Sequence, residues 1–243
     1  MNLVIDIGNT QVKLCVFNKN EIIYHAYFKN LDSKIFSKLI AEFEVDKGIF
    51  SDTRGLEINL LKKMLPPQFN LLELTYKTPL PIKIDYKTPQ SLGKDRIAGA
   101  VGAWEQHPNT PLLIIDIGTA ITIDYVSSNG TFQGGIISPG PEMRFKALHQ
   151  FTGKLPLLEP IENVELIGNT TSTSIQSGVQ NGILYEIKGY IDQYRKNNNE
   201  IKIVLTGGFS YLFENKINYP IFADSLLVPK GLNSIINYSS KSF

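Results

Sequence analysis

The stretch Val4-Ile5-Asp6-Ile7-Gly8-Asn9-Thr10 is an apolar run that ends in Asp-x-Gly, and its core returns as Ile114-Ile115-Asp116-Ile117-Gly118-Thr119-Ala120. The two aspartates are 110 residues apart. In both copies the apolar run predicts a strand, Asp-x-Gly predicts a sharp turn, and a second β-rich run predicts the returning strand. The repeat therefore predicts twin hairpins, one in each half of the chain.

The two turns have the chemistry of a phosphate site. Glycine allows a tight turn and lets phosphate oxygens approach backbone N–H groups that a Cβ would block. An aspartate beside phosphates would repel them, so this interpretation requires a cation such as Mg²⁺ between the two charges. A single Asp-x-Gly turn is also common in plain hairpins, where the aspartate bonds to its own backbone. Duplication at a fixed offset favours the phosphate site.

Composition limits the classes of function. The chain has 243 residues, 42% hydrophobic and 19% charged, as in ordinary globular proteins. A net charge of +1 gives no support for a nucleic-acid or anionic-membrane partner. The single Cys15 excludes an intrachain disulfide and fits a reducing cytoplasm, with a buried thiol as the simplest interpretation. No apolar run approaches the length of a membrane span, and no signal peptide is expected.

The order of expected elements predicts the fold class. The first half reads βββαβαβ, and the second half repeats a similar unit, so each half predicts a mixed sheet covered on both faces. After the first hairpin we expect strands at 22–28, 45–50 and 71–74 and helices at 35–43 and 55–65. After the second hairpin we expect strands at 132–137, 201–205 and near 226–228, a helix at 142–151, an extended insertion at 152–166, and a long helix with caps in 170–174.

The segment between the halves is expected to be irregular over 75–92, with room for one edge strand. A helix rich in small residues then runs from Ser91 to about Glu105, where small side chains permit close helix packing. In the long helix of the second half, Ile175, Val179, Ile183, Ile187 and Ile191 recur at steps of four. This stripe predicts either intrachain core or a surface for a partner chain.

These motifs resemble those of the type III pantothenate kinases, in the superfamily of actin-like ATPases and sugar kinases. The resemblance spans nearly the whole chain and depends on several short motifs occurring in order. The motifs are Asp6 to Thr10 with Lys13, Tyr86 with Pro89 and Gly93-Lys94-Asp95-Arg96, Asp116 to Ala120, Gly134 to Gly140, Thr171 with Ser174 and Gly178, and Thr206-Gly207-Gly208.

The resemblance implies two duplicated ribonuclease-H-like domains, 1–110 and 111–243, each with a mixed five-stranded sheet. It implies transfer of the ATP γ-phosphate to the primary hydroxyl of pantothenate, the first step towards coenzyme A. The enzyme would be a cytoplasmic homodimer that uses Mg²⁺ and a monovalent cation, K⁺ or NH₄⁺.

The resemblance also implies roles for individual residues. Nucleotide-phosphate contacts would come from Asp6, Ile7, Gly8, Asn9, Thr10, Gln11, Val12, Lys13 and Thr119, and Asp116 would bind the monovalent cation. Pantothenate contacts would come from Tyr86, Gly93, Lys94, Asp95 and Arg96, with Asp95 as the general base. Thr171, or its neighbour Thr170, would reach the substrate from the dimer partner. Independently of the family, an aspartate can accept a hydroxyl proton as the bond forms, and the planar fork of Arg96 suits a carboxylate.

Two other functions remain open from sequence. The same fold and turns could serve a kinase for another small hydroxylated or carboxylated substrate, because they do not choose the acceptor. The chain could instead be a non-catalytic nucleotide-binding regulator. Retention of Asp95, Asp116 and both glycine turns argues against a decayed site.

Overall fold

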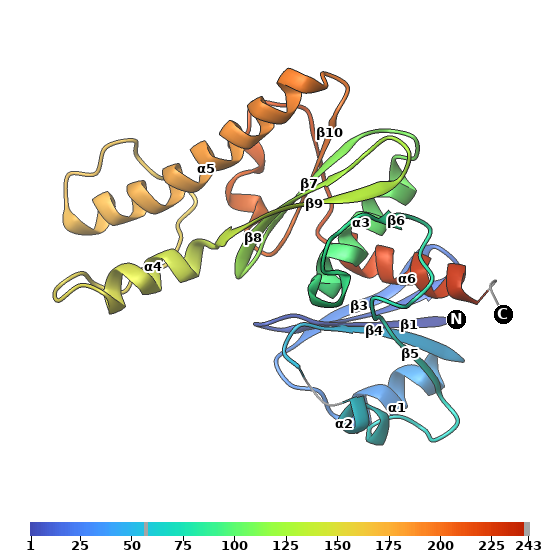
Figure 1. Ribbon diagram of the computed structural model, residues 1–243. Coiled ribbons are helices and arrows are strands. Elements are labelled where there is room, and N and C mark those ends of the chain that lie inside the picture. Colours follow the sequence, from blue (N-terminus) through green and yellow to red (C-terminus); the bar gives the residue numbers. More distant parts are fainter. Residues whose placement is uncertain (56–57, 241–243) are drawn as a thin grey trace. The chain divides into compact units, whose positions relative to one another are not determined.

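The computed structural model describes residues 1–55 and 58–240 and divides the chain into two units (Figure 1). The first unit comprises Met1–Asn109, Gly130–Gln133 and Leu226–Phe243, and the second comprises Thr110–Asn129 and Gly134–Ser225. The domain division at residues 110 and 111 stays a prediction. The units differ from it because a short segment near Gly130 and the C-terminal helix pack with the first half.

The first unit contains a mixed five-stranded sheet in the order β3-β2-β1-β4-β5. Its strands are β1 (Asn2–Ile7), β2 (Val12–Asn18), β3 (Glu21–Phe28), β4 (Lys47–Asp52) and β5 (Asn70–Glu73). The β1–β2 and β2–β3 pairs are antiparallel, whereas β1–β4 and β4–β5 are parallel. The predicted βββαβαβ order and the α/β class are confirmed for this unit.

Helices cover both faces of this sheet (Figure 1). The helices α1 (Ser33–Glu42) and α2 (Ile58–Lys63) lie on one face, and α3 (Lys94–Gln106) and α6 (Leu227–Ser239) lie on the other. The expected helix over 55–65 includes Leu56 and Glu57, which lie outside the described residues. The sequence offers Asp32 or Ser33 as the cap of α1, and the cap is Asp32, since its carboxylate accepts a hydrogen bond from Lys34 N at 3.0 Å. Phe36 and Leu39 of α1 complete a core with the apolar side chains of β1, β2 and β4.

The helices α3 and α6 pack closely because small residues line their contact. A Cβ placed on Gly102 would lie 2.4 Å from the carbonyl oxygen of Leu227. The small residues of the predicted helix therefore bring the two backbones together.

The expected strand near Leu226 to Val228 is wrong. The strand in this region is β11 (Ile221–Ala223), and the chain enters α6 at Leu227. Pro229 explains the difference, because proline lacks an N–H for a central strand but fits the first turn of a helix. Leu232, Ile235 and Ile236, which follow at helical spacing, are buried.

The second sheet has six strands in the order β11-β10-β7-β8-β9-β6, so the predicted five-stranded count is wrong for it. Its other strands are β7 (Leu112–Ile117), β8 (Ala120–Val126), β9 (Thr131–Pro139) and β10 (Lys202–Thr206). The sixth strand is the two-residue β6 (Lys83–Ile84), which pairs with Thr131 and Phe132 of β9. At the start of β9, Lys83 N and Asp85 N donate to the carbonyls of Gly130 and Phe132 at 2.8 and 2.9 Å, so β6 extends this edge of the sheet.

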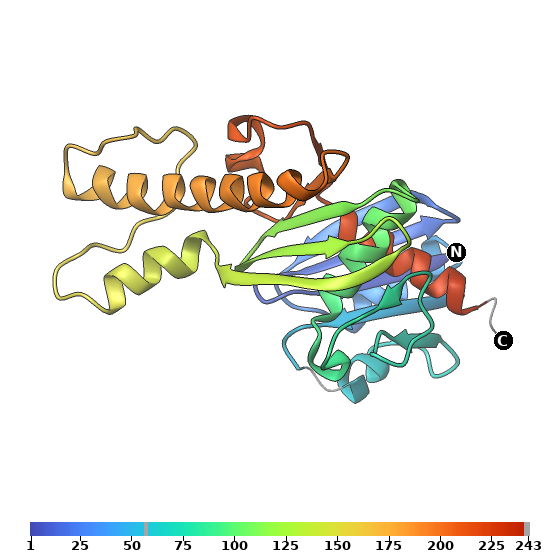
Figure 2. The same ribbon diagram turned by 45° about the horizontal axis from the view of Figure 1, so that its top comes forward.

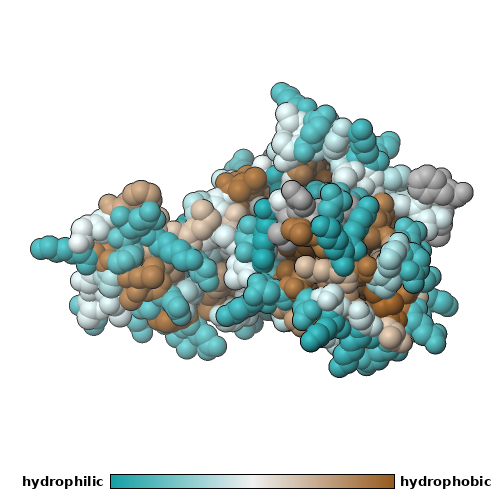
Figure 3. Space-filling view, turned by 90° about the horizontal axis from the view of Figure 1, so that it is seen from below, coloured by the Kyte–Doolittle hydropathy of each residue, from teal (hydrophilic) through white to brown (hydrophobic). Residues whose placement is uncertain are grey.

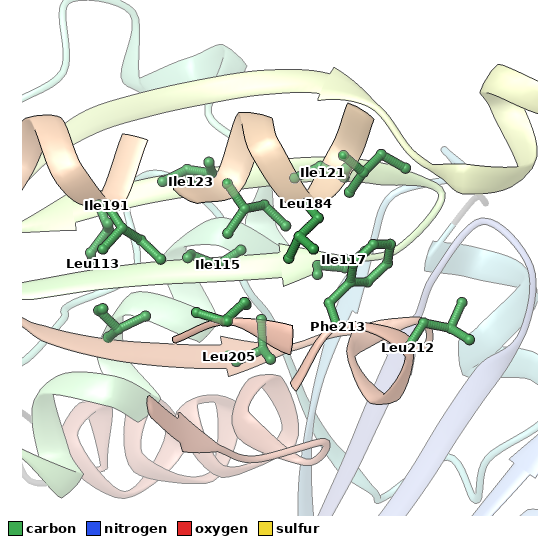
Figure 4. Packing of buried hydrophobic residues seen from close by; sticks show 14 of the residues in the cluster. Leu113, Ile115, Ile117, Ile121, Ile123, Leu184, Ile191, Leu205, Leu212 and Phe213 are labelled. Carbon is green, nitrogen blue, oxygen red and sulfur yellow. The ribbon is translucent and has the colours of Figure 1, made fainter. Parts of the chain in front are cut away.

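The long helix α5 (Thr171–Asn197) packs on β7 and β8, as Figure 4 shows for Leu184 and Ile191. The stripe from Ile175 to Ile191 is buried in this cluster. The isoleucine stripe is therefore intrachain core, and its interpretation as a surface for a partner chain is wrong. The remaining helix is α4 (Pro141–Gln150), and short 3₁₀ turns lie at Pro89–Ser91, Ser210–Leu212 and Glu214–Lys216.

Residues 151–170 connect α4 to α5 without a helix or strand, as the predicted insertion requires. Polar side chains of α5 hold this segment in place. The side-chain amide of Gln180 both accepts from Ile161 N at 2.9 Å and donates to Ile161 O at 2.7 Å. Ser177 donates to the carbonyl of Leu166 at 2.7 Å. The α5 face thus supplies the partners that a strand would otherwise provide.

No described helix is both long and apolar enough to cross a membrane. The thiol of Cys15 is fully buried, as expected, and burial raises its pKa to about 12.

Candidate active site

The first Asp-x-Gly turn places a buried carboxylate at the end of β1. Asp6 lies opposite Lys13 of β2 and beside Ser51 of β4 in the strand register. The Ser51 hydroxyl donates to Asp6 Oδ1 at 2.9 Å, and Asp6 is only 7% exposed. Asn9 and Thr10 are exposed at the turn, whereas the side chains of Ile7 and Val12 are buried. Ile7 and Val12 can therefore reach a nucleotide only through their main chains.

The residues after β4 brace this turn, and sequence reasoning missed them. Thr53 donates to the Ile7 carbonyl from both N and Oγ1 at 3.0 Å, and Arg54 Nε donates to the Gly8 carbonyl. The available signal was the polar ending of the strand predicted at 45–50. Because β4 is parallel to β1, its carboxyl end meets the same edge of the sheet as Asp6.

Burial is the main influence on the charge of Asp6. It raises the pKa of this carboxyl, Lys13 and the Ser51 hydrogen bond lower it, and the charge of Asp95 raises it further. The residue predicted to contact the phosphates and the predicted base both belong to the first unit.

The predicted Gly-Lys-Asp-Arg motif lies at the amino end of α3. Asp95 Oδ1 accepts from Arg96 N at 2.9 Å, which turns the carboxylate back over Gly93. A Cβ on Gly93 would lie 2.6 Å from that oxygen, so the position requires glycine to keep the carboxylate where it is. Lys94 has a different partner, since its ammonium forms a salt bridge with Glu73 at 2.9 Å.

The guanidinium of Arg96 lies beside two aromatic rings that also pack against each other. Its central carbon is 5.9 Å from the ring centre of Tyr86 and 5.6 Å from that of Phe132. Arg96 is 7% exposed, and Phe132 is fully buried. The structure therefore brings together the predicted pair Tyr86 and Arg96, and it adds Phe132, which no sequence motif indicated.

The second Asp-x-Gly turn belongs to the second unit and differs from the first. Asp116 lies opposite Thr122 of β8, where the first copy has Lys13. Gly207 packs against Asp116: its φ is +99°, and a Cβ there would lie 2.4 Å from Asp116 Oδ1. Gly140 N donates to the Thr119 carbonyl at 3.0 Å. Three predicted motifs of the second half thus converge on Asp116 and Thr119.

Of the threonines at the start of α5, Thr170 and Thr173 cap the helix and Thr171 does not. Thr170 Oγ1 accepts from Thr173 N at 3.2 Å, and Thr173 Oγ1 accepts from Thr170 N at 3.0 Å, which forms a capping box. Thr171 is exposed and takes no part in this cap. It lines a groove of about 1200 Å³ with Phe151 and other residues of α4, α5 and the 151–170 segment.

Exposed apolar side chains extend from this groove. Phe151 is 81%, Leu166 66% and Ile167 82% exposed, and we call these three residues the α4–α5 patch. Both ribbon views place α4 along the first half of α5 (Figures 1 and 2), and hydrophobic surface is visible at this end of the second unit, on the left in Figure 3. Exposed apolar side chains of this size are typical of a protein interface.

The donor groups present fit a metal ion that arrives with a nucleotide. Among residues 1–55 and 58–240, no three His, Cys, Asp or Glu side chains form a metal-binding group. Mg²⁺ is commonly bound by one or two carboxylates together with phosphates and water. Asp6, a buried carboxylate at the first Asp-x-Gly turn, can supply such a ligand.

Comparison with known proteins identifies the family. The model of the type III pantothenate kinase family matches residues 2–193. A type III pantothenate kinase of Azobacteroides pseudotrichonymphae is 43% identical over 243 residues, which is 100% of this chain and 99% of the relative.

Solved structures agree on the fold. A conserved protein of Campylobacter jejuni, described as a Baf family transcriptional activator, has a TM-score of 0.66 at 22% identity and covers 98% of this chain and 99% of its own. A protein of Sinorhizobium meliloti, described as a 2-dehydro-3-deoxygalactonokinase, has a TM-score of 0.59 at 11% identity over 100% of this chain and 99% of its own. These and further neighbours have the fold of the actin-like ATPases and sugar kinases. With its repeated Asp-x-Gly turn, the Asp95–Arg96 pair and a full-length relative, the chain belongs to the type III pantothenate kinases.

Proposed function

We propose that this chain transfers the γ-phosphoryl group of ATP to the primary hydroxyl of pantothenate with Asp95 as the general base. The family's reaction yields 4′-phosphopantothenate, the first step of coenzyme A biosynthesis. The observation that supports the residue assignment is the position of Asp95 at the amino end of α3, where Arg96 N holds its carboxylate over Gly93 in the same unit as the Asp6 turn. A phosphate site and a base for the acceptor hydroxyl must lie near one another for in-line transfer.

Phosphoryl transfer from ATP to a hydroxyl requires no covalent bond between the protein and the phosphoryl group. Phosphoryl transfer passes through a loose transition state, so positioning and charge stabilisation supply most of the acceleration. Asp95 would orient the hydroxyl and take its proton as the new P–O bond forms. Backbone N–H groups of the turn at residues 8–11, with Lys13, would hold the phosphates, and Arg96 would bind the pantothenate carboxylate.

Kinases of this family use ATP with a metal ion, and we propose Mg²⁺ held through Asp6 and the phosphates. When bound, the ion neutralises phosphate charge. Burial raises the pKa of Asp6, and the nearby ammonium of Lys13 and hydroxyl of Ser51 partly oppose this effect. A bound cation would add to their effect and favour the ionised carboxylate.

We further propose that Asp116 binds a monovalent cation, K⁺ or NH₄⁺, and that Thr119 contacts the nucleotide. The two Asp-x-Gly turns have diverged, because Lys13 faces Asp6 and Thr122 faces Asp116. In the strand register Thr122 adds no positive charge beside Asp116, whereas Lys13 supplies positive charge beside Asp6, and this difference supports separate cation roles for the two turns.

Asp116→Asn should lower the apparent affinity for K⁺ by about 10- to 100-fold, the range for losing a charged contact, while Mg²⁺ dependence stays nearly unchanged. Rates titrated separately with each cation measure both. Asp192→Asn, which neutralises an exposed carboxylate of α5, is the matched control and should alter neither titration. A normal K⁺ response with a lost Mg²⁺ response would reverse the assignment.

A homodimer is the proposed assembly, with Thr171 reaching the substrate bound by the partner chain. The α4–α5 patch and the adjoining groove support this interface, and the exposed hydroxyl of Thr171 at the groove supports its choice over the capping Thr170.

Light scattering should give twice the chain mass of 27.2 kDa at assay concentrations. Phe151→Glu should shift the mass towards one chain and reduce activity, because it places a charge within the apolar patch. Tyr211→Glu, at an exposed aromatic residue outside the patch, is the control and should leave the dimer intact. A wild-type monomer that still turns over would contradict the proposal.

An ATP-consumption assay with and without pantothenate, in K⁺ and in Na⁺ buffer, tests the function. Consumption should require pantothenate and respond to K⁺. Turnover with another hydroxylated acid in place of pantothenate would support the other-substrate kinase, and nucleotide binding without turnover would support the regulator. A cytoplasmic location stays a proposal, supported by the buried free thiol of Cys15.

A further inference from the structure

Phe132 has no part in the motifs that define the family resemblance, yet it holds two of the proposed substrate contacts. Its ring lies 5.6 Å from the guanidinium carbon of Arg96 and 6.2 Å, edge-on at 61°, from the ring of Tyr86. Phe132 is fully buried, so this packing is fixed on its other sides. All three residues belong to the first unit.

The backbone of Phe132 also places Tyr86. Phe132 pairs with Ile84 in the β6–β9 ladder, and its carbonyl accepts from Asp85 N at 2.9 Å. This hydrogen bond fixes the residue immediately before Tyr86. One residue of β9 therefore sets both the chain position of Tyr86 and the packing of Arg96.

We infer that Phe132 is a positioning residue that orients the Arg96 fork towards the substrate carboxylate and so sets the preference for a carboxylate-bearing acceptor. The inference rests on the proposed function, in which Arg96 binds that carboxylate. A guanidinium is planar and weakly hydrated, and it is stabilised over an aromatic face. Contact with two rings restricts its rotamers before substrate binds, which reduces the ordering that binding must still supply.

The rings do not touch the reacting atoms, which predicts a specific kinetic signature. Loss of the Phe132 ring should weaken carboxylate binding and leave ATP binding and proton transfer nearly intact. Phe132→Leu should raise KM for pantothenate about 3- to 30-fold, the range for a partly desolvated cation–π contact, with kcat and KM for ATP little changed.

Pantothenol, in which a neutral hydroxymethyl group replaces the carboxylate, separates positioning from folding. The preference for pantothenate over pantothenol, measured as the ratio of kcat/KM values, should fall by the same 3- to 30-fold in Phe132→Leu. Phe50→Leu is the matched control, because Phe50 is also a buried phenylalanine of the first unit and packs in the main core. It should lower stability without changing this ratio.

A ring of the same shape but weaker negative face gives a second test that does not depend on Phe132→Leu folding. Trifluorinated phenylalanine at position 132 keeps the packing and weakens attraction for the guanidinium. The full-length protein carrying it should show a reduced preference between the two substrates, while the thermal midpoint stays near that of the wild type.

Arg96→Ala distinguishes failure of the inference from failure of the proposed function. If Arg96→Ala abolishes the preference and both changes at Phe132 preserve it, Phe132 is structural only and the inference is overturned. If Arg96→Ala itself leaves the preference intact, the proposed role of Arg96 is wrong and the inference falls with it. The inference is supported if the preference is reduced in Arg96→Ala and in both proteins changed at Phe132, and is unchanged in Phe50→Leu.

Discussion

Asp95→Asn is expected to lower kcat by roughly 10²- to 10⁴-fold, with a modest change in KM for either substrate. The asparagine keeps the shape of the side chain and the acceptor oxygen that bonds to Arg96 N, so the amino end of α3 should stay folded. What it loses is the ability to take the proton of the acceptor hydroxyl. That loss acts mainly in the transition state, so kcat carries the effect.

Glu105→Gln is the matched control for Asp95→Asn, because it removes an exposed carboxylate from the last turn of the same helix. Steady-state kinetics with ATP and pantothenate varied in turn should leave this control near the wild type. A near-normal kcat in Asp95→Asn would contradict the assignment of the base. The motif would then have only a structural role at the start of α3.

The parts of the fold that sequence predicted are those with strong local signals. The hairpins around Asp6 and Asp116 follow from alternating or continuous apolar runs that end in a glycine turn, and the cap at Asp32 follows from its side-chain chemistry. The long helix α5 was recognisable because its isoleucines recur at one helical face. Each of these features is decided within a few residues along the chain.

The parts that sequence missed depend on tertiary partners. Two residues, Lys83 and Ile84, are too few to show strand periodicity, and they form β6 because the start of β9 offers backbone partners. The α6 helix was read as a strand at its first residues, since the apolar run from Leu226 to Val228 fits either structure until Pro229 is weighed.

The same distinction applies to the candidate site. Asp6, Asp95 and Arg96 were found because their motifs are contiguous, whereas Ser51 and Phe132 act from strands distant in sequence. A serine at a strand end and a phenylalanine in a β-rich run carry no chemical signal alone. Their roles become visible only when the register places Ser51 beside Asp6 and the packing places Phe132 against Arg96.

The second large effect is expected for replacement of Asp6 by asparagine, which should increase stability and decrease activity. Burial raises the pKa of this carboxyl above its ordinary value, so its ionised form is disfavoured in the folded protein. A folded-state pKa above the unfolded one contributes stability below the unfolded pKa, near 4, and that contribution disappears as pH rises through the folded pKa. At neutral pH, without ligands, the ionised Asp6 therefore opposes folding, and replacing it with a neutral isostere should stabilise the protein.

Asp6→Asn should accordingly raise the thermal midpoint at pH 7.5 by more than at pH 4, while kcat/KM for ATP falls by about 10²-fold or more because the phosphates lose their positioning group. Differential scanning calorimetry at both pH values, without nucleotide or metal, measures the first effect, and kinetics measures the second. Asp32→Asn is the control, because asparagine caps a helix as well as aspartate does and the exposed Asp32 carboxylate is not desolvated in the folded protein. A lower midpoint at pH 7.5 would mean that Lys13 and Ser51 outweigh burial, so that Asp6 is a structural ion pair. A buried carboxylate that lowers stability is expected to have a role in ligand binding. A gain in stability with unchanged kinetics would therefore contradict the proposed role of Asp6 in binding phosphates.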